Sequence, residues 1–155
     1  MTIIDTMIGY AGSWKATYKL WMSPDAAPLE SLSSAIVSSM VNGKFVCIEY
    51  TWTVDGNLVE GEFFIGLEPK TQLVTMVWVD AWHNGERFMI CQGEVRPDGA
   101  LSVLGSYPAP EGPDWGWRTV IAPGEGSFSI RMYNIPPGGA ELLAVEAVYT
   151  PMVNP

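Results

Sequence analysis

Charged residues are scarce in this sequence, and basic ones are scarcest. Lys, Arg, Asp and Glu make up 16% of the 155 residues, with 8 basic side chains against 17 acidic ones and a net charge of −9. A protein that binds nucleic acid or anionic lipid needs a basic surface to attract the phosphates and displace their counterions. No cluster of Lys and Arg overrides the average. The composition therefore argues against nucleic-acid and membrane partners.

Cysteine, histidine and long apolar runs are also rare. Cys47 and Cys91 lie in strand-like runs, where a free thiol behaves as a small hydrophobe, and no secretory leader points to an oxidising compartment. His83 is the only histidine, so the usual zinc-ligand spacings do not occur. No apolar run is long enough to span a bilayer, and phosphate-binding loops and the GxSxG motif are missing. We expect a cytoplasmic protein without metal or cofactor.

Turn signals and short strand-like runs dominate what is present. The pairs Asn42-Gly43, Asp55-Gly56 and Asn84-Gly85 are typical of hairpin turns between runs of β-branched and aromatic residues. The serine-rich segment 31–41 is compatible with a helix, but its β-branched residues and the turn that follows favour a strand. We expect about ten strands, at 12–21, 31–41, 44–54, 58–67, 73–83, 87–95, 100–105, 115–122, 127–134 and 141–150.

Consecutive hairpins favour an all-β, up-and-down antiparallel barrel, since closure removes the sheet edges that would otherwise aggregate. We expect one domain over residues 1–155. Residues 1–11 are either a short helix that covers one end of the barrel or a frayed terminus.

The segment 73–83 combines two indoles, an acid and the histidine. If strand alternation holds, Met76, Trp78, Asp80 and Trp82 share one face, which we interpret as facing the lumen. A buried, unpaired Asp80 would cost roughly several kcal/mol, so it should have a partner. Arg118 is the best candidate, because a guanidinium binds a carboxylate through two parallel hydrogen bonds.

Several short motifs resemble those of a known family. Gly12-Ser13-Trp14 is similar to the GxW start of lipocalin-like (calycin) barrels. In order and spacing, residues 7–150 resemble a bacterial family of unknown function with calycin-like barrels, through Asn42-Gly43-Lys44-Phe45, Asp55-Gly56, Glu60-Gly61, Ile65-Gly66-Leu67, Trp78-Val79-Asp80, Gly93-Glu94, Trp117-Arg118 and Glu146-Ala147-Val148-Tyr149.

The resemblance implies a single barrel with a pocket at one end and a small-molecule ligand, and it implies no reaction. The haem-binding nitrobindins share the GxW start but ligate haem through a histidine near the C-terminus. This sequence has no histidine there, so we expect no haem.

The candidate site residues are rings and a few polar groups. For ligand binding we name Trp14, Tyr18, Trp78, Asp80, Trp82, Trp117, Arg118 and Tyr149. The candidate catalytic residues are Asp80, Arg118 and His83. Lesser candidates for the polar patch around Asp80 and Arg118, which would orient a polar group of the ligand or act as a base, are Glu49, Glu62, Glu94, Arg131, Glu146 and Tyr149. Each ring could instead be plain core, Asp80 and Arg118 a structural pair, and His83 a solvent-exposed turn residue at the barrel rim.

Three functional interpretations follow. We favour binding of a small hydrophobic or aromatic molecule in the barrel lumen. The alternative is a cofactor-independent isomerase, cyclase or lyase that acts on an apolar substrate in the same pocket. A homodimer through outward rings such as Trp21 and Trp52 is compatible with either.

Overall fold

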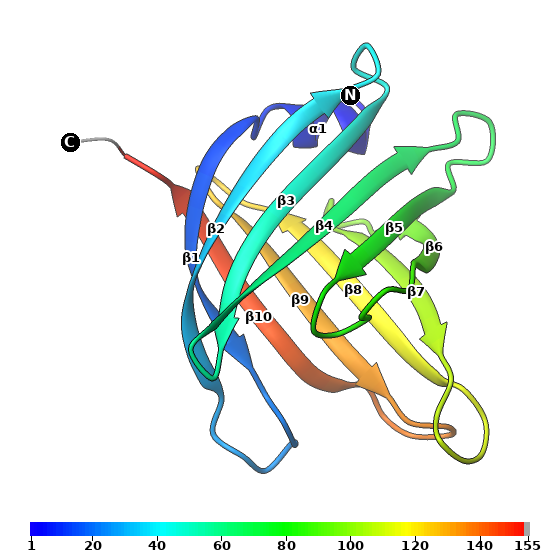
Figure 1. The fold of residues 1–155 in the computed structure, drawn as a ribbon. Coiled ribbons are helices and arrows are strands. Elements are labelled where there is room, and N and C mark those ends of the chain that lie inside the picture. The colour runs from blue at the N-terminus through cyan, green and yellow to red at the C-terminus, as the bar shows by residue number, and fades with distance from the viewer. Residues whose placement is uncertain (154–155) are drawn as a thin grey trace.

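Ten antiparallel strands close into one barrel, and a short N-terminal helix lies at one end of it (Figure 1). The computed structural model describes residues 1–153. The elements are α1 (Ile3–Ile8), β1 (Gly12–Leu20), β2 (Leu29–Met40), β3 (Phe45–Val54), β4 (Asn57–Leu67), β5 (Val74–Asp80), β6 (Met89–Val95), β7 (Leu101–Tyr107), β8 (Trp115–Pro123), β9 (Phe128–Ile135) and β10 (Leu142–Pro151).

Each strand pairs with its neighbours in the chain, and β1 pairs with both β2 and β10. In the closing pair, Tyr18 lies opposite Ala147 and Lys15 opposite Thr150. The predicted up-and-down barrel is therefore confirmed. The serine-rich segment is strand β2, because its residues alternate between the barrel interior and the outer wall.

The barrel has two different ends. At the helix end lie α1 and the turns β2–β3, β4–β5, β6–β7 and β8–β9, whereas the loop end carries the five remaining connections (Figure 1). In α1, Thr2 and Asp5 cap each other's backbone N–H groups, and Ile3, Ile4 and Met7 are buried. Of the two alternatives for residues 1–11, the short helix is confirmed, over residues 3–8. This helix is too short to cross a membrane, and residues 1–153 contain no other helix.

Aromatic rings fill much of the lumen, from the helix end to the loop end. Along β5, Val74, Met76, Trp78 and Asp80 are buried while the residues between them are half-buried, as the alternation predicted. The rings packed inside with less than 2% of their surface exposed are Trp52, Trp78, Tyr149, Phe63 and Phe128, with Tyr18 at 2%. The interior is therefore packed largely with the protein's own rings.

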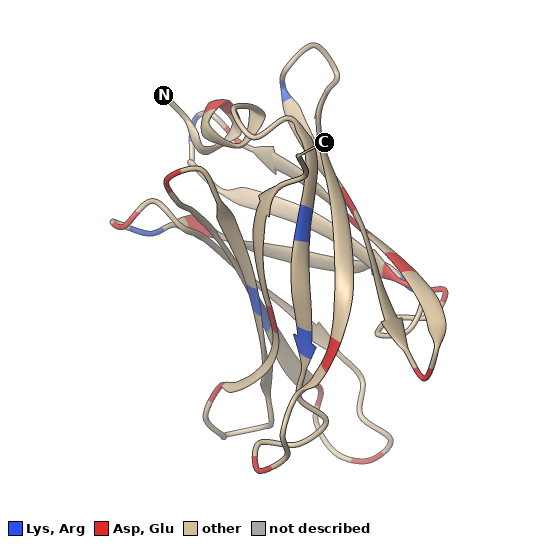
Figure 2. Ribbon diagram, turned by 90° about the vertical axis from the view of Figure 1, so that its left-hand side faces the viewer, with Lys and Arg blue, Asp and Glu red and all other residues tan. Residues whose placement is uncertain are grey.

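The outer wall carries most of the charge. Acidic residues are spread over strands and loops, and the few basic residues do not gather into a patch (Figure 2). Arg131 and Glu146 form an outer-wall ion pair of 2.9 Å across β9 and β10. The prediction that Trp52 faces outward is wrong: it is 1% exposed, because Val46, Ile48, Tyr50 and Trp52 occupy the inward positions of β3.

Candidate ligand pocket at the loop end

Strand β5 ends at Asp80, and the chain then turns back across the mouth of the barrel. Residues 81–86 form a succession of turns, with the Asn84 N–H bonded to the Asp80 carbonyl. The predicted strand continued to residue 83 and placed Trp82 on the lumen face. That placement is wrong, since the alternation stops at Asp80 and Trp82 is 42% exposed at the rim.

Asp80 fixes this turn by accepting four hydrogen bonds. Its Oδ1 accepts the backbone N–H groups of Trp82 and His83, both at 2.9 Å. Its Oδ2 accepts the Tyr50 hydroxyl at 2.6 Å and the Trp52 indole N–H at 3.1 Å. Both oxygens are thus occupied by the protein itself, and the buried carboxyl group serves as the anchor of the turn.

A glycine makes the Tyr50–Asp80 bond possible. Tyr50, Gly61 and Asp80 stand in register on β3, β4 and β5, and the tyrosine ring lies across the glycine to reach the acid. A Cβ at Gly61 would lie 2.2 Å from Tyr50 Cζ. The indole N–H of Trp78, the preceding inward residue of β5, donates to the same hydroxyl at 2.9 Å and joins this network.

Arg118 does not pair with Asp80, so that expectation is wrong. Trp117 and Thr119 take the inward positions of β8, which turns Arg118 to the outer wall. There its guanidinium donates to Ser102 Oγ at 2.9 Å and to the Glu141 carboxylate. The Asp80 carboxyl group instead accepts hydrogen bonds from a hydroxyl, an indole and two backbone N–H groups. The spacing of residues in the sequence does not reveal this combination of donors.

His83 turns inward from the rim and closes part of the mouth. Its Nε2 lies 3.2 Å from the hydroxyl of Tyr18 on β1, so the ring does not point into solvent as the alternative of an exposed turn residue predicts. Four indoles surround the imidazole, with ring centroids 4.8 to 5.5 Å away: those of Trp52, Trp78, Trp82 and Trp117.

The surrounding rings remove the His83 imidazole from water, and this burial determines its charge. Burial lowers the pKa of His83 from 6.5 to about 4, against the opposing attraction of Asp80. The imidazole is therefore neutral near pH 7. Burial, together with the charge of Asp80, also holds the pKa of Tyr18 well above its usual range, so the hydroxyl keeps its proton.

A pocket of about 490 Å³ opens beside His83, between the turn after β5 and strands β6 to β8. A volume of this size accommodates a small ring compound. Its lining is formed by Trp78, Trp82, His83, Asn84, Arg87, Phe88, Met89, Ser106, Tyr107, Pro108 and Trp117.

Comparisons with known proteins agree with this fold. Residues 5–151 match a family described as protein of unknown function, DUF1579. The chain belongs to the DUF1579 family. The resemblance to a family of unknown function with barrel structures is thereby confirmed. The crystal structure of Rv2717c from M. tuberculosis is similar over 99% of both chains, with a TM-score of 0.64 at 15% identity, which shows a shared fold. Among curated proteins, none matches.

The pocket of this DUF1579 barrel contains only some of the residues predicted for ligand binding. Trp78, Trp82 and Trp117 line it, as does the catalytic candidate His83. The other predicted residues lie elsewhere: Tyr18 and Asp80 hold the turn in place, Arg118 is on the outer wall, and Trp14 and Tyr149 pack against Phe128.

Prediction missed the part of the lining that comes from the turns. Arg87, Phe88 and Met89 follow the Asn84-Gly85 turn, and Ser106 to Pro108 begin a proline-rich segment that the sequence places at a rim. The available signal was the Asp80 side chain, because an aspartate at a strand end often caps the backbone two residues on. That pattern would have moved Trp82 and His83 from the strand into a turn.

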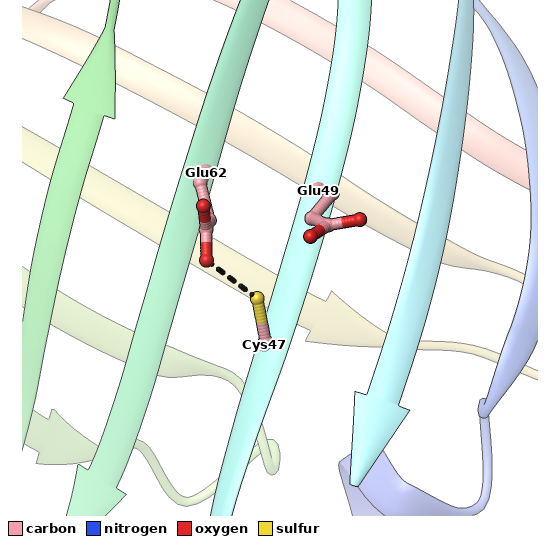
Figure 3. A group of neighbouring side chains, drawn as sticks. All are labelled: Cys47, Glu49 and Glu62. Carbon is pink, nitrogen blue, oxygen red and sulfur yellow. Dashed lines mark hydrogen bonds between the residues drawn. The ribbon is translucent and has the colours of Figure 1, made fainter. Parts of the chain in front are cut away.

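The lesser candidates Glu49 and Glu62 lie on the outer wall of the DUF1579 barrel, beside Cys47 (Figure 3). Their ligand atoms lie within 4.8 Å of one another, the spacing that a shared cation would need. The thiol donates to Glu62 Oε1 at 2.9 Å. Burial first, then the bond to Glu62 and the two negative charges, raise the pKa of Cys47 to about 12. The thiol therefore keeps its proton.

Proposed function

We propose that this protein binds a small hydrophobic or aromatic molecule in the loop-end pocket. The observation that carries the proposal is the convergence of indole rings around a neutral imidazole at an opening of about 490 Å³. Aromatic walls bind flat apolar molecules through burial and offset stacking, without any need for charge. The family match and the barrel fold are consistent with ligand binding.

The polar groups at the pocket favour binding over catalysis. An isomerase, cyclase or lyase without a cofactor needs a proton acceptor that is open to its substrate. Both oxygens of Asp80 are occupied by four donors. With a pKa of about 4, His83 is a weak base. The proposed role of both residues is therefore to shape and line the pocket.

Thermal unfolding with small naphthalenes tests the proposal. We expect 2-acetylnaphthalene or 2-isopropenylnaphthalene to raise the midpoint, since a ligand at about 100 times its Kd adds about 2.7 kcal/mol to the free energy of unfolding. Phe88 lines the pocket and is 75% exposed, so Phe88→Ala should weaken binding with little loss of fold stability.

Leu32→Ala is the matched control. Leu32 is an apolar residue of β2, 84% exposed and outside the pocket lining. It should leave binding unchanged. No midpoint shift with either compound, or equal weakening by the two variants, would contradict a ligand site at the loop end.

A further inference from the structure

The direction of the Tyr18–His83 hydrogen bond assigns the proton of the imidazole. Tyr18 is 2% exposed, and within residues 1–153 the hydrogen-bond partner of its hydroxyl is His83 Nε2. A buried hydroxyl that donates nothing would lose hydrogen-bond energy, so Tyr18 should donate and Nε2 should accept. A neutral imidazole carries one N–H group, which is then at Nδ1.

The Nδ1–H group is directed away from Tyr18. The two nitrogens of an imidazole point in widely divergent directions, and Nε2 is aimed at β1. His83 itself lines the pocket on the side of β5 to β8. Among residues 1–153, no acceptor bonds to Nδ1. On the adjacent residue, the Nδ2 atom of Asn84 is buried and also lacks a partner. His83 and Asn84, which both line the pocket, therefore carry N–H groups that make no hydrogen bond to residues 1–153.

We propose that the ligand of the loop-end pocket is a planar ring compound that carries a carbonyl-type oxygen, and that His83 Nδ1–H donates to this oxygen. The inference rests on the proposed function and adds the chemical class of the ligand. The exposed rings of Trp82 and Phe88 line the pocket beside His83, and such a lining favours a flat apolar body. The His83 Nδ1–H group among these rings favours a hydrogen-bond acceptor on that body. Tyr18 is the positioning residue, because it holds the proton at Nδ1 from behind the ring.

The tautomer can be measured directly, since the chain contains a single histidine. In ¹⁵N-histidine-labelled protein near pH 7, the protonated and bare ring nitrogens give well-separated signals. We expect the Nδ1–H form in the wild type. Tyr18→Phe removes the donor to Nε2 without touching the pocket lining, so the Nδ1–H preference should weaken or disappear. An Nε2–H form in the wild type would overturn the inference.

A matched ligand pair tests the class of ligand. 2-Acetylnaphthalene and 2-isopropenylnaphthalene have the same outline, but only the first carries an oxygen acceptor. We expect calorimetry to show the ketone binding about fivefold tighter to the wild type, the typical worth of one hydrogen bond. His83→Phe, which keeps a ring but no donor, should abolish the ratio.

The outcomes separate the two proposals. Binding of neither compound contradicts the proposed function. Equal binding of both supports the proposed function and overturns the inference about the oxygen. Because the wild-type comparison needs no variant, it stands even if His83→Phe does not fold.

Discussion

Acid should destabilise this protein through its one histidine. Burial lowers the pKa of His83 to about 4 from an ordinary 6.5. The unfolded chain therefore binds a proton near pH 6.5, whereas the folded chain does so only near pH 4, and the free energy of unfolding falls as pH decreases between these values. Above about pH 7 the histidine is neutral in both the folded and the unfolded chain, so it no longer lowers the free energy of unfolding. At about pH 5, the two pKa values correspond to a loss of about 2 kcal/mol.

Urea unfolding at a series of pH values, with wild type and His83→Gln, measures this loss. Both proteins carry the same 17 acidic residues, so the difference between their curves isolates the histidine. We expect the wild type to be more sensitive to acid between about pH 7 and pH 5, while the difference flattens above that range. Parallel curves, or a His83 NMR signal that titrates near pH 6.5, would refute the enclosure of the ring.

Three further results are expected. Asp80→Asn should lower the free energy of unfolding, measured in urea, by at least about 3 kcal/mol, since four donors lose a charged acceptor. Asp98→Asn affects one hydrogen bond in a turn and should lower it by about 1 kcal/mol. Equal losses would contradict the role of Asp80 as the anchor of its turn. Gly61→Ala should displace the Tyr50 ring and cost more than about 2 kcal/mol, and an unchanged midpoint would contradict that packing. Cys47, with a pKa of about 12, should react with a thiol reagent at pH 8 only after unfolding; fast native labelling would show a thiolate.

The barrel could be predicted because each strand carries its own local signal. Asn42-Gly43 and Asp55-Gly56 both adopt positive φ at hairpin turns, as their residue types indicate. Alternation along β5 correctly placed Trp78 and Asp80 inside. These features depend on neighbours in the chain, and in an up-and-down barrel chain neighbours are also sheet neighbours.

The pocket could not be predicted in the same way, because it depends on where a strand stops. The alternation pattern takes no account of a side chain that hydrogen-bonds to the backbone and ends the strand. Extended past Asp80, the pattern therefore placed Trp82 on the lumen face, which is wrong. Charge alone favours Arg118 as the partner of Asp80, but a buried carboxyl group can equally be hydrogen-bonded by neutral donors such as the Tyr50 hydroxyl. Identifying that partner requires the register of β3, β4 and β5, which turn signals alone fix only loosely.

The most direct test of ligand binding at the loop end is a titration of the ¹⁵N-labelled protein with 2-acetylnaphthalene, followed through the seven indole N–H signals. The pocket predicts that the signals of Trp78, Trp82 and Trp117 move with the ligand. Trp14, whose indole donates to the Tyr10 carbonyl beyond α1, should stay in place. A titration that moves none of the three pocket signals, or moves Trp14 alone, would contradict the account.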